Sequence, residues 1–263
     1  MKTIRFLFLV FSFAIGLALP VSAQLQEGSR NFSRAVQWAA LQSTVKVSKG
    51  QAIGSGTIVG KDRYSVWILT AAHVVDNSGK LRITYYWWDG QNRPSGNAEK
   101  SVVAIDKTGD CALIRMQRIG QCPPARPICP VSQRMNPDRL PVLSVGGDGG
   151  GNPDCWTAWS YGHGFRHTNY SSSVFTIVGR EPIGGRSGGP LFDTRGYVIG
   201  VCVASGGGEG MFATLNNIHR VCDKANASWL YGSSRPIRPL PQRYKPSRPL
   251  PIIWEPIYVE PFC

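Results

Sequence analysis

The sequence predicts an all-β protein. Glycine and proline are abundant, at 30 and 19 of the 263 residues. Between them lie apolar runs that have the length of single strands and follow one another at regular spacing. Short, regularly spaced strands indicate barrels or a sandwich, whereas βαβ units would alternate strands with helical segments.

Residues 1–23 have the composition of an export signal. A short positive region precedes an almost wholly apolar run from Phe6 to Leu19, and small residues lie ahead of an expected cleavage site before Gln24. The alternative is a membrane anchor, but the run is short for a span and no stop-transfer pattern follows it. We therefore expect an exported protein, periplasmic or extracellular.

The N-terminal segment 24–42 is expected to be partly helical, because apolar residues between Asn31 and Gln42 fall on one side of a helix. From residue 43 the pattern becomes that of strands. The strands expected in the first half are Val45–Val47, Gly54–Gly60, Val66–Leu69, Leu81–Trp88, Ser101–Ile105 and Ala112–Met116. Asp89-Gly90 is a hairpin turn signal.

Residues 120–139 are rich in proline and arginine, and they are expected to link the two halves. The second half begins near Pro141–Leu143, and its last expected strands are Val198–Ala204 and Gly210–Leu215. The glycine run 146–151 lacks the Gly-Lys-Ser/Thr ending of a phosphate loop, and no helical pattern follows it. We expect it to be a flexible surface loop.

The segment 232–263 differs in composition, with eight prolines interspersed with basic residues. Such a tail is expected to be extended and largely disordered. It is either a solvated tail or an arm that docks to a partner or an anionic envelope surface. The aromatic residues Trp254, Tyr258 and Phe262 slightly favour docking.

The net charge of +13 could serve contacts with nucleic acid, anionic lipid or cell-wall polymer. No block of Lys and Arg with interleaved aromatics is found, so no nucleic-acid partner is expected. Cysteine spacing matches no zinc site, so neither a metal nor another cofactor is expected. Export permits disulfides, and Cys122 with Cys129 is the expected local pair among seven cysteines, of which at least one is free or pairs between chains.

Three residues have the chemistry and chain order of an acyl-transfer triad. His73 ends the run Leu69–His73, Asp110 opens an apolar strand 37 positions later, and Ser187 lies 77 positions further on in Gly184–Pro190. A serine hydroxyl needs a nearby base at neutral pH, and that base needs an orienting acceptor. We predict Ser187 as nucleophile, His73 as base and Asp110 as orienting acid.

The glycines around Ser187 fit the same chemistry, since the turn must present the hydroxyl and aim backbone N–H groups at a developing oxyanion. Gly185 and Ser187 are the expected donors. Asp106 is a less suitable acid than Asp110, because it precedes residues 107–109, which have the character of an exposed turn.

These motifs resemble those of the trypsin-like (chymotrypsin-fold) serine peptidases, especially the bacterial Deg/HtrA-type branch, although no PDZ-like domain is expected here. The matching runs are Gly54–Val59, Leu69–Val75, Val102–Asp106, Asp110–Ile114, Gly185–Leu191, Gly196–Val201 and Gly210–Ala213. The resemblance implies a peptidase domain over 43–231. It would hold two six-stranded antiparallel β-barrels, about 43–119 and 140–220, with the active site at their interface.

The resemblance also implies substrate-binding positions. Glu181 would lie at the base of the primary pocket, where an acid favours a basic side chain, and Val203, Ala204 and Ser205 would form the strand that pairs with substrate. The alternative for Glu181 is a solvent-facing place on an irregular loop. Arg186 departs from the family, which usually has Asp or Asn there.

In digestive zymogens that Asp pairs with a newly cut N-terminus. An arginine cannot form this pair, so activation by such cleavage is not expected, and the support of the oxyanion turn is left open. The sequence thus predicts an exported serine endopeptidase that acts on protein or peptide substrates through an acyl-enzyme. A catalytically inactive binding module and an envelope-attached interaction protein are the alternatives. The oligomeric state is not predicted.

Overall fold

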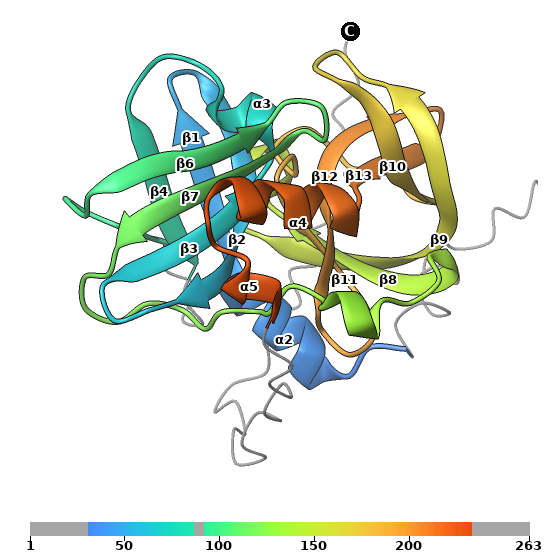
Figure 1. The fold of residues 1–263 in the computed structure, drawn as a ribbon, viewed down its shortest axis with the longest axis horizontal. Helices are drawn as coiled ribbons and strands as arrows, with labels where there is room; N and C mark the ends of the chain where they lie inside the picture. Colours follow the sequence, from blue (N-terminus) through green and yellow to red (C-terminus); the bar gives the residue numbers. More distant parts are fainter. Residues whose placement is uncertain (1–30, 87–91, 233–263) are drawn as a thin grey trace, which may run out of the picture.

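The computed structural model describes residues 31–86 and 92–232. The expected export signal, the Asp89-Gly90 turn and the proline-rich tail lie outside the described residues. Strands dominate the described chain (Figure 1). They are β1 Thr44–Lys49, β2 Ala52–Lys61, β3 Ser65–Thr70, β4 Leu81–Tyr86, β5 Asn92–Pro94, β6 Lys100–Asp106, β7 Cys111–Gln117, β8 Asp138–Gly146, β9 Asp154–His167, β10 Ser172–Val178, β11 Pro190–Phe192, β12 Val198–Gly206 and β13 Glu209–Ala213.

The helices in the described residues are short. They are α2 Arg34–Ser43, α3 Ala72–Val75, α4 Leu215–Lys224 and α5 Trp229–Gly232, with 3-10 turns η2 Val131–Gln133 and η3 Asp148–Gly150. The Ser33 side chain accepts a hydrogen bond from the Val36 N–H at 3.3 Å and so caps α2 at its first turn. Among the described residues no helix is both long and apolar enough to cross a membrane.

The strands form two antiparallel sheets, one from each half of the chain. The second half closes into a six-stranded barrel of order β10-β13-β12-β11-β8-β9, and the first half is a seven-stranded sheet of order β5-β4-β1-β2-β3-β7-β6. The predicted all-β class is confirmed, and so is the barrel of the second half. In the described residues the first half is a seven-stranded sheet rather than the expected closed six-stranded barrel, and its additional strand, β5, pairs with β4 at the edge. Pro94 lacks an N–H for a further partner, as is usual for edge strands.

The end of the described chain returns to cover the first sheet. Every residue of β3 is buried, because β2 and β7 flank it and helices pack on the outer side. A Cβ on Gly60 of β2 would come within 2.2 Å of Leu230, and the ring of Trp229 packs edge-on against Trp67 at 5.9 Å. The close contact at Gly60 therefore seats α5 on the sheet, next to α4 (Figure 1).

Asp106 precedes a turn in which Lys107 and Thr108 are exposed, as expected, but Asp106 itself is enclosed. Its side chain is buried and accepts hydrogen bonds from the Arg220 guanidinium at 2.6 and 2.8 Å and from Lys224 at 3.2 Å. Both partners lie on α4, more than a hundred residues away along the chain. Asp106 therefore fastens α4 to β6, a role that local sequence pattern does not reveal.

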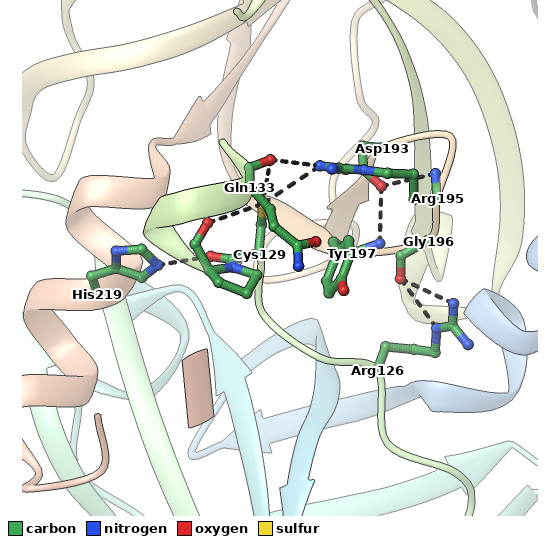
Figure 2. A network of polar contacts seen from close by, with 9 residues as sticks. Arg126, Cys129, Gln133, Asp193, Arg195, Gly196, Tyr197 and His219 are labelled. Atoms are coloured by element: carbon green, nitrogen blue, oxygen red, sulfur yellow. Dashed lines mark hydrogen bonds and ion pairs between the residues drawn. The ribbon is translucent and has the colours of Figure 1, made fainter. Parts of the chain in front are cut away.

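The linker between the halves is bound to the second barrel through one turn. Figure 2 shows Arg126 donating to the Gly196 carbonyl, at 3.3 and 3.0 Å, and Arg195 donating to the Gln133 carbonyl at 2.8 Å. Asp193, which is fully buried, holds Arg195 through its side chain and accepts the Arg195 and Tyr197 N–H groups. The Asp193 carboxylate thus shapes the turn that anchors the linker.

The expected disulfide is not formed, since all six described cysteines are free. Cys129 is buried in the linker, where its sulfur lies 3.5 Å from the Gln133 carbonyl and 3.7 Å from the Arg195 guanidinium. Cys122 is held elsewhere, because Lys61 of β2 donates to its carbonyl at 3.5 Å and to that of Pro123 at 2.8 Å. The prediction of a Cys122–Cys129 pair is therefore wrong for this structure.

Replacing Asp193 by Asn should destabilise the protein, because the amide would face buried N–H donors that now have a carboxylate acceptor. We expect Asp193→Asn to lower the free energy of unfolding by about 2–3 kcal/mol in urea denaturation. Asp138→Asn, at an exposed residue of β8, is the matched control and should change it by less than about 0.5 kcal/mol. Equal effects of the two substitutions would contradict the anchoring role.

Candidate active site

His73 is presented by a single helical turn at the end of a buried strand. β3 leads through Ala71 into α3, and the Ala72 N–H donates to the Asp110 carbonyl at 3.2 Å. The His73 N–H donates to Asp110 Oδ1 at 2.9 Å, and His73 Nδ1 lies 2.7 Å from Asp110 Oδ2. Because a carboxylate only accepts, Nδ1 carries a proton, so in the neutral ring Nε2 is the acceptor.

Asp110 is fully buried, and both of its oxygens are engaged by His73. Its φ is +51°, a left-handed conformation that Asp tolerates better than most residues. Asp110 occupies the turn between β6 and β7, which places the carboxylate under the histidine. The side chain of His73 is 28% exposed, so the ring is fixed from beneath while part of it remains open to solvent.

The turn that carries Ser187 packs against the end of β3, beside the histidine. The Ser55 N–H donates to the Ser187 carbonyl at 2.7 Å. A Cβ on Gly188, where φ is +85°, would lie 2.1 Å from the Ser55 carbonyl oxygen and 2.3 Å from the Thr70 hydroxyl. Only glycine allows this approach.

Gly54 marks the contact between the Ser187 turn and α3. A Cβ there would lie 2.6 Å from the Ser187 carbonyl oxygen and 2.7 Å from Val74. Val74 follows His73 directly in α3. The structure therefore brings the Ser187 turn, His73 and Asp110 to the same part of the seam between the two halves.

Gly185 lies in a turn whose central peptide unit has a defined orientation. The Arg186 N–H donates to the Ile183 carbonyl at 3.1 Å, and φ of Gly185 is +94°, as in a type II turn. The Gly184 carbonyl accepts from the Gly149 N–H at 2.6 Å. Since the C=O and N–H of a trans peptide point in opposite directions, the Gly185 N–H points away from the glycine run 146–151.

The glycine run is tied to both halves of the molecule rather than forming a free surface loop. From the first sheet, Lys46 donates to the Gly150 carbonyl and Tyr86 donates to the Gly151 carbonyl, each at 2.8 Å. A Cβ on Gly185 would lie 2.4 Å from the Gly150 nitrogen. Burial raises the pKa of Tyr86 to about 12.

Tyr170 is a neighbour of His73 that the sequence did not indicate. It lies at the tip of the β9–β10 hairpin, and its ring is 5.9 Å from the His73 ring between centroids. Its hydroxyl donates to Asp76 at 2.7 Å, and Lys107 pairs with the same carboxylate at 2.7 Å. Burial, together with the hydrogen bond to Asp76, holds the pKa of Tyr170 above its usual value. The hairpin therefore bridges the two halves at the histidine, from a position 97 residues away in sequence.

The residues expected to bind substrate lie near one end of the second barrel. On β12, Val203 is buried, Ala204 is half-buried and Ser205 is exposed. Ser205 pairs with Gly210 of β13, and Gly210 packs on Pro182 and the Arg180 carbonyl. Glu181, between those two residues, is exposed rather than enclosed in a pocket.

Comparison with known proteins relates this arrangement to one family. A sequence model described as "Trypsin-like peptidase domain" matches residues 54–201. A protein of Chlamydia pneumoniae described as "Probable periplasmic serine endoprotease DegP-like" is 29% identical over 180 residues, covering 62% of this chain and 31% of its own. A protein of the same description from Chlamydia trachomatis is 27% identical over 174 residues, covering 60% and 29%. This chain thus spans less than a third of the length of these curated relatives.

Solved structures of the Rv3671c protease of M. tuberculosis have a similar fold. The inactive form has a TM-score of 0.58 at 23% identity, over 73% of this chain and 93% of that one. The active form has a TM-score of 0.57 at 22% identity, over 77% and 86%.

The tie between Tyr86 and the glycine run should depend on pH. The pKa of the Tyr86 hydroxyl rises from 10 to about 12 on folding. Its contribution to stability is therefore complete below about pH 10 and is lost as the pH rises through about 12. We expect Tyr86→Phe to lower the unfolding free energy by about 1 kcal/mol near neutral pH.

Urea unfolding at increasing pH tests this. Between about pH 8 and about pH 11 the wild type should lose stability more steeply than Tyr86→Phe, because only the wild type has this hydroxyl to titrate. Parallel pH curves for the two proteins would contradict the assignment.

Proposed function

Since the chain belongs to the trypsin-like peptidase domain family, we propose that it is an exported serine endopeptidase acting through His73, Asp110 and Ser187. The observation that carries the proposal is the pair of hydrogen bonds by which buried Asp110 fixes His73, at 2.9 and 2.7 Å, beside the Ser187 turn. Peptidase activity in the family makes proteins or peptides the substrate class. The description of the Chlamydia relatives as periplasmic supports export.

In the proposed reaction the Ser187 hydroxyl attacks the peptide carbonyl carbon while His73 Nε2 accepts its proton. The tetrahedral intermediate collapses when His73 gives that proton to the leaving amine, and an acyl-enzyme remains. Water then attacks the ester with His73 again as base, which releases the acid and restores Ser187. Asp110 keeps Nδ1 protonated throughout and stabilises the imidazolium that forms.

The N–H groups of Gly185 and Ser187 are the proposed donors to the oxyanion. The support for Gly185 is the orientation of its peptide unit, whose carbonyl is held by the Gly149 N–H at 2.6 Å. Donors fixed before the reaction stabilise the developing charge without reorganising. Val203, Ala204 and Ser205 would present the strand edge to the substrate backbone, with Glu181 nearby.

Labelling with a fluorophosphonate tests the nucleophile. The wild type should label and should cleave peptide substrates, whereas Ser187→Ala should not label and should lose about 10⁵–10⁶ in kcat. Ser132→Ala, at an exposed serine of η2, is the control and should behave as wild type. If the folded wild type neither labels nor cleaves, the hypothesis of a catalytically inactive binding module would be favoured instead.

The role of Glu181 is tested by varying the substrate side chain that precedes the scissile bond. If Glu181 faces that side chain, Glu181→Gln should lower the preference for Lys or Arg over Leu about tenfold in kcat/KM, because one charge pair is removed. Glu99→Gln, at an exposed residue just before β6, should leave the preference unchanged. An unchanged preference in Glu181→Gln would place this residue outside the substrate site.

A further inference from the structure

We propose that the ion pair between Arg186 and Asp148 is an internal clamp that holds the Gly184–Gly185 peptide in the orientation needed for oxyanion binding. The inference rests on the proposed function and names a further positioning residue for it, Asp148. With this ion pair, folding of the domain alone is enough to hold the turn in the conformation that binds the oxyanion, and no newly cut N-terminus is required.

Arg186 is a fully buried charge directly before the nucleophile. Its Nε and one terminal nitrogen lie 2.8 and 2.9 Å from the two oxygens of Asp148, and the same terminal nitrogen contacts Asp154. The guanidinium also lies over the Trp156 ring, 5.2 Å from its centroid. Burial by itself lowers the pKa of Arg186, but the hydrogen bonds and charges of Asp148 and Asp154 outweigh it and leave the pKa above its usual value.

Asp148 connects this charge to the oxyanion turn. It is the first residue of η3, and the Gly149 N–H, next to it, donates to the Gly184 carbonyl at 2.6 Å. The turn and the loop are thus joined twice, by the 186–148 side chains and by the 149–184 backbone bond. Because the Gly184 carbonyl points to the loop, the Gly185 N–H points away from it.

The glycines need such external support. Gly184 and Gly185 form a turn that permits more than one orientation of the peptide between them, since glycine adopts φ of either sign at little cost. In a type I turn that peptide would be rotated, and the carbonyl would no longer point to the loop. A buried bidentate ion pair has the geometric specificity to select one orientation.

The loop in turn is fastened to the first half of the molecule. Lys46 and Tyr86 hold the carbonyls of Gly150 and Gly151, and the Ser55 hydroxyl accepts from the Gly147 N–H at 3.0 Å while donating to the Gly185 carbonyl at 2.9 Å. Asp148 therefore lies in a loop whose neighbouring residues are hydrogen-bonded to the first sheet.

The positive charge of Arg186 decides which kind of group can pair with it and hold the turn. A free N-terminal ammonium would repel Arg186, whereas a carboxylate attracts it, and the carboxylate here comes from the same barrel. Asp148 is 27% exposed and Asp154 65% exposed at the side chain. Asp148 is the less exposed carboxylate and accepts two hydrogen bonds from Arg186, so it is the one that sets the position of the guanidinium.

Kinetics with a chromogenic peptide ester test the proposal. Asp148→Asn should lower kcat about 10²-fold, the usual effect of losing one oxyanion donor, with KM changed less than about threefold. The affinity of a peptide boronic acid, which mimics the tetrahedral intermediate, should fall by a similar factor. The pH profile should not move, because the His73–Asp110 contacts are untouched. Asp138→Asn makes the same change of charge at an exposed site and should behave as wild type.

Each other outcome overturns the inference. If the wild type labels with fluorophosphonate and folded Asp148→Asn keeps kcat within about threefold, the clamp is wrong and the proposed function stands. If Asp148→Asn does not fold, Arg186→Lys decides, because lysine keeps the charge but not the paired bonds; wild-type kcat in that variant would overturn the clamp. A folded wild type that does not label would overturn both the clamp and the proposed function.

Discussion

The two halves of this protein meet at Ser55, and the arrangement of the site depends on its hydrogen bonds. Its N–H donates to the Ser187 carbonyl, its carbonyl accepts from the Thr70 hydroxyl, and its hydroxyl joins Gly185 to Gly147. All these groups belong to a residue only 2% exposed, where an unmade hydrogen bond would be costly. One serine of the first sheet therefore fixes the turn before His73 and the turn of Ser187 relative to each other.

Buried charges act in the same way over longer distances. The chain is strongly basic, yet each buried acid in the part of the chain that the structure describes has a partner: Asp110 has His73, Asp106 has α4, and Asp193 has Arg195. Among residues 31–86 and 92–232, Arg186 is the one cation buried completely, and it has Asp148. A buried charge without a partner is costly. The pairs of Asp110, Asp106 and Arg186 therefore restrict how segments far apart in sequence can pack, whereas the pair of Asp193 fixes the shape of a single turn.

Local pattern in the sequence was sufficient for most strands of the first half, for β12 and β13, and for nominating His73, Asp110 and Ser187, but it did not indicate β5, β9, β10 or β11. Strand periodicity and a glycine-rich turn are properties of a few neighbouring residues. What the sequence could not show were contacts between distant segments, such as Arg186 with Asp148 or Tyr170 with Asp76, which are 38 and 94 residues apart. The same limit explains one wrong expectation and one contact that the sequence did not indicate. Cys122 and Cys129 are close in sequence but are held by different neighbours, and Asp106 is buried by a helix that comes from the other end of the domain.

A glycine-rich turn presents a nucleophile well but specifies its own shape poorly. Gly188 must be glycine because the backbone of β2 and the Thr70 hydroxyl leave no room for a Cβ, and Gly185 must be glycine because Gly150 does the same. The conformational freedom that makes these contacts possible would also let the N–H of Gly185, the proposed oxyanion donor, turn away. Order must therefore come from residues outside the turn. Arg186, the residue next to Ser187, is well placed to supply it, since its side chain is fully buried and pairs with Asp148. The residue before Ser187 can therefore be acidic or basic, provided that the loop facing it carries the opposite charge. Arg186 with Asp148 meets this condition.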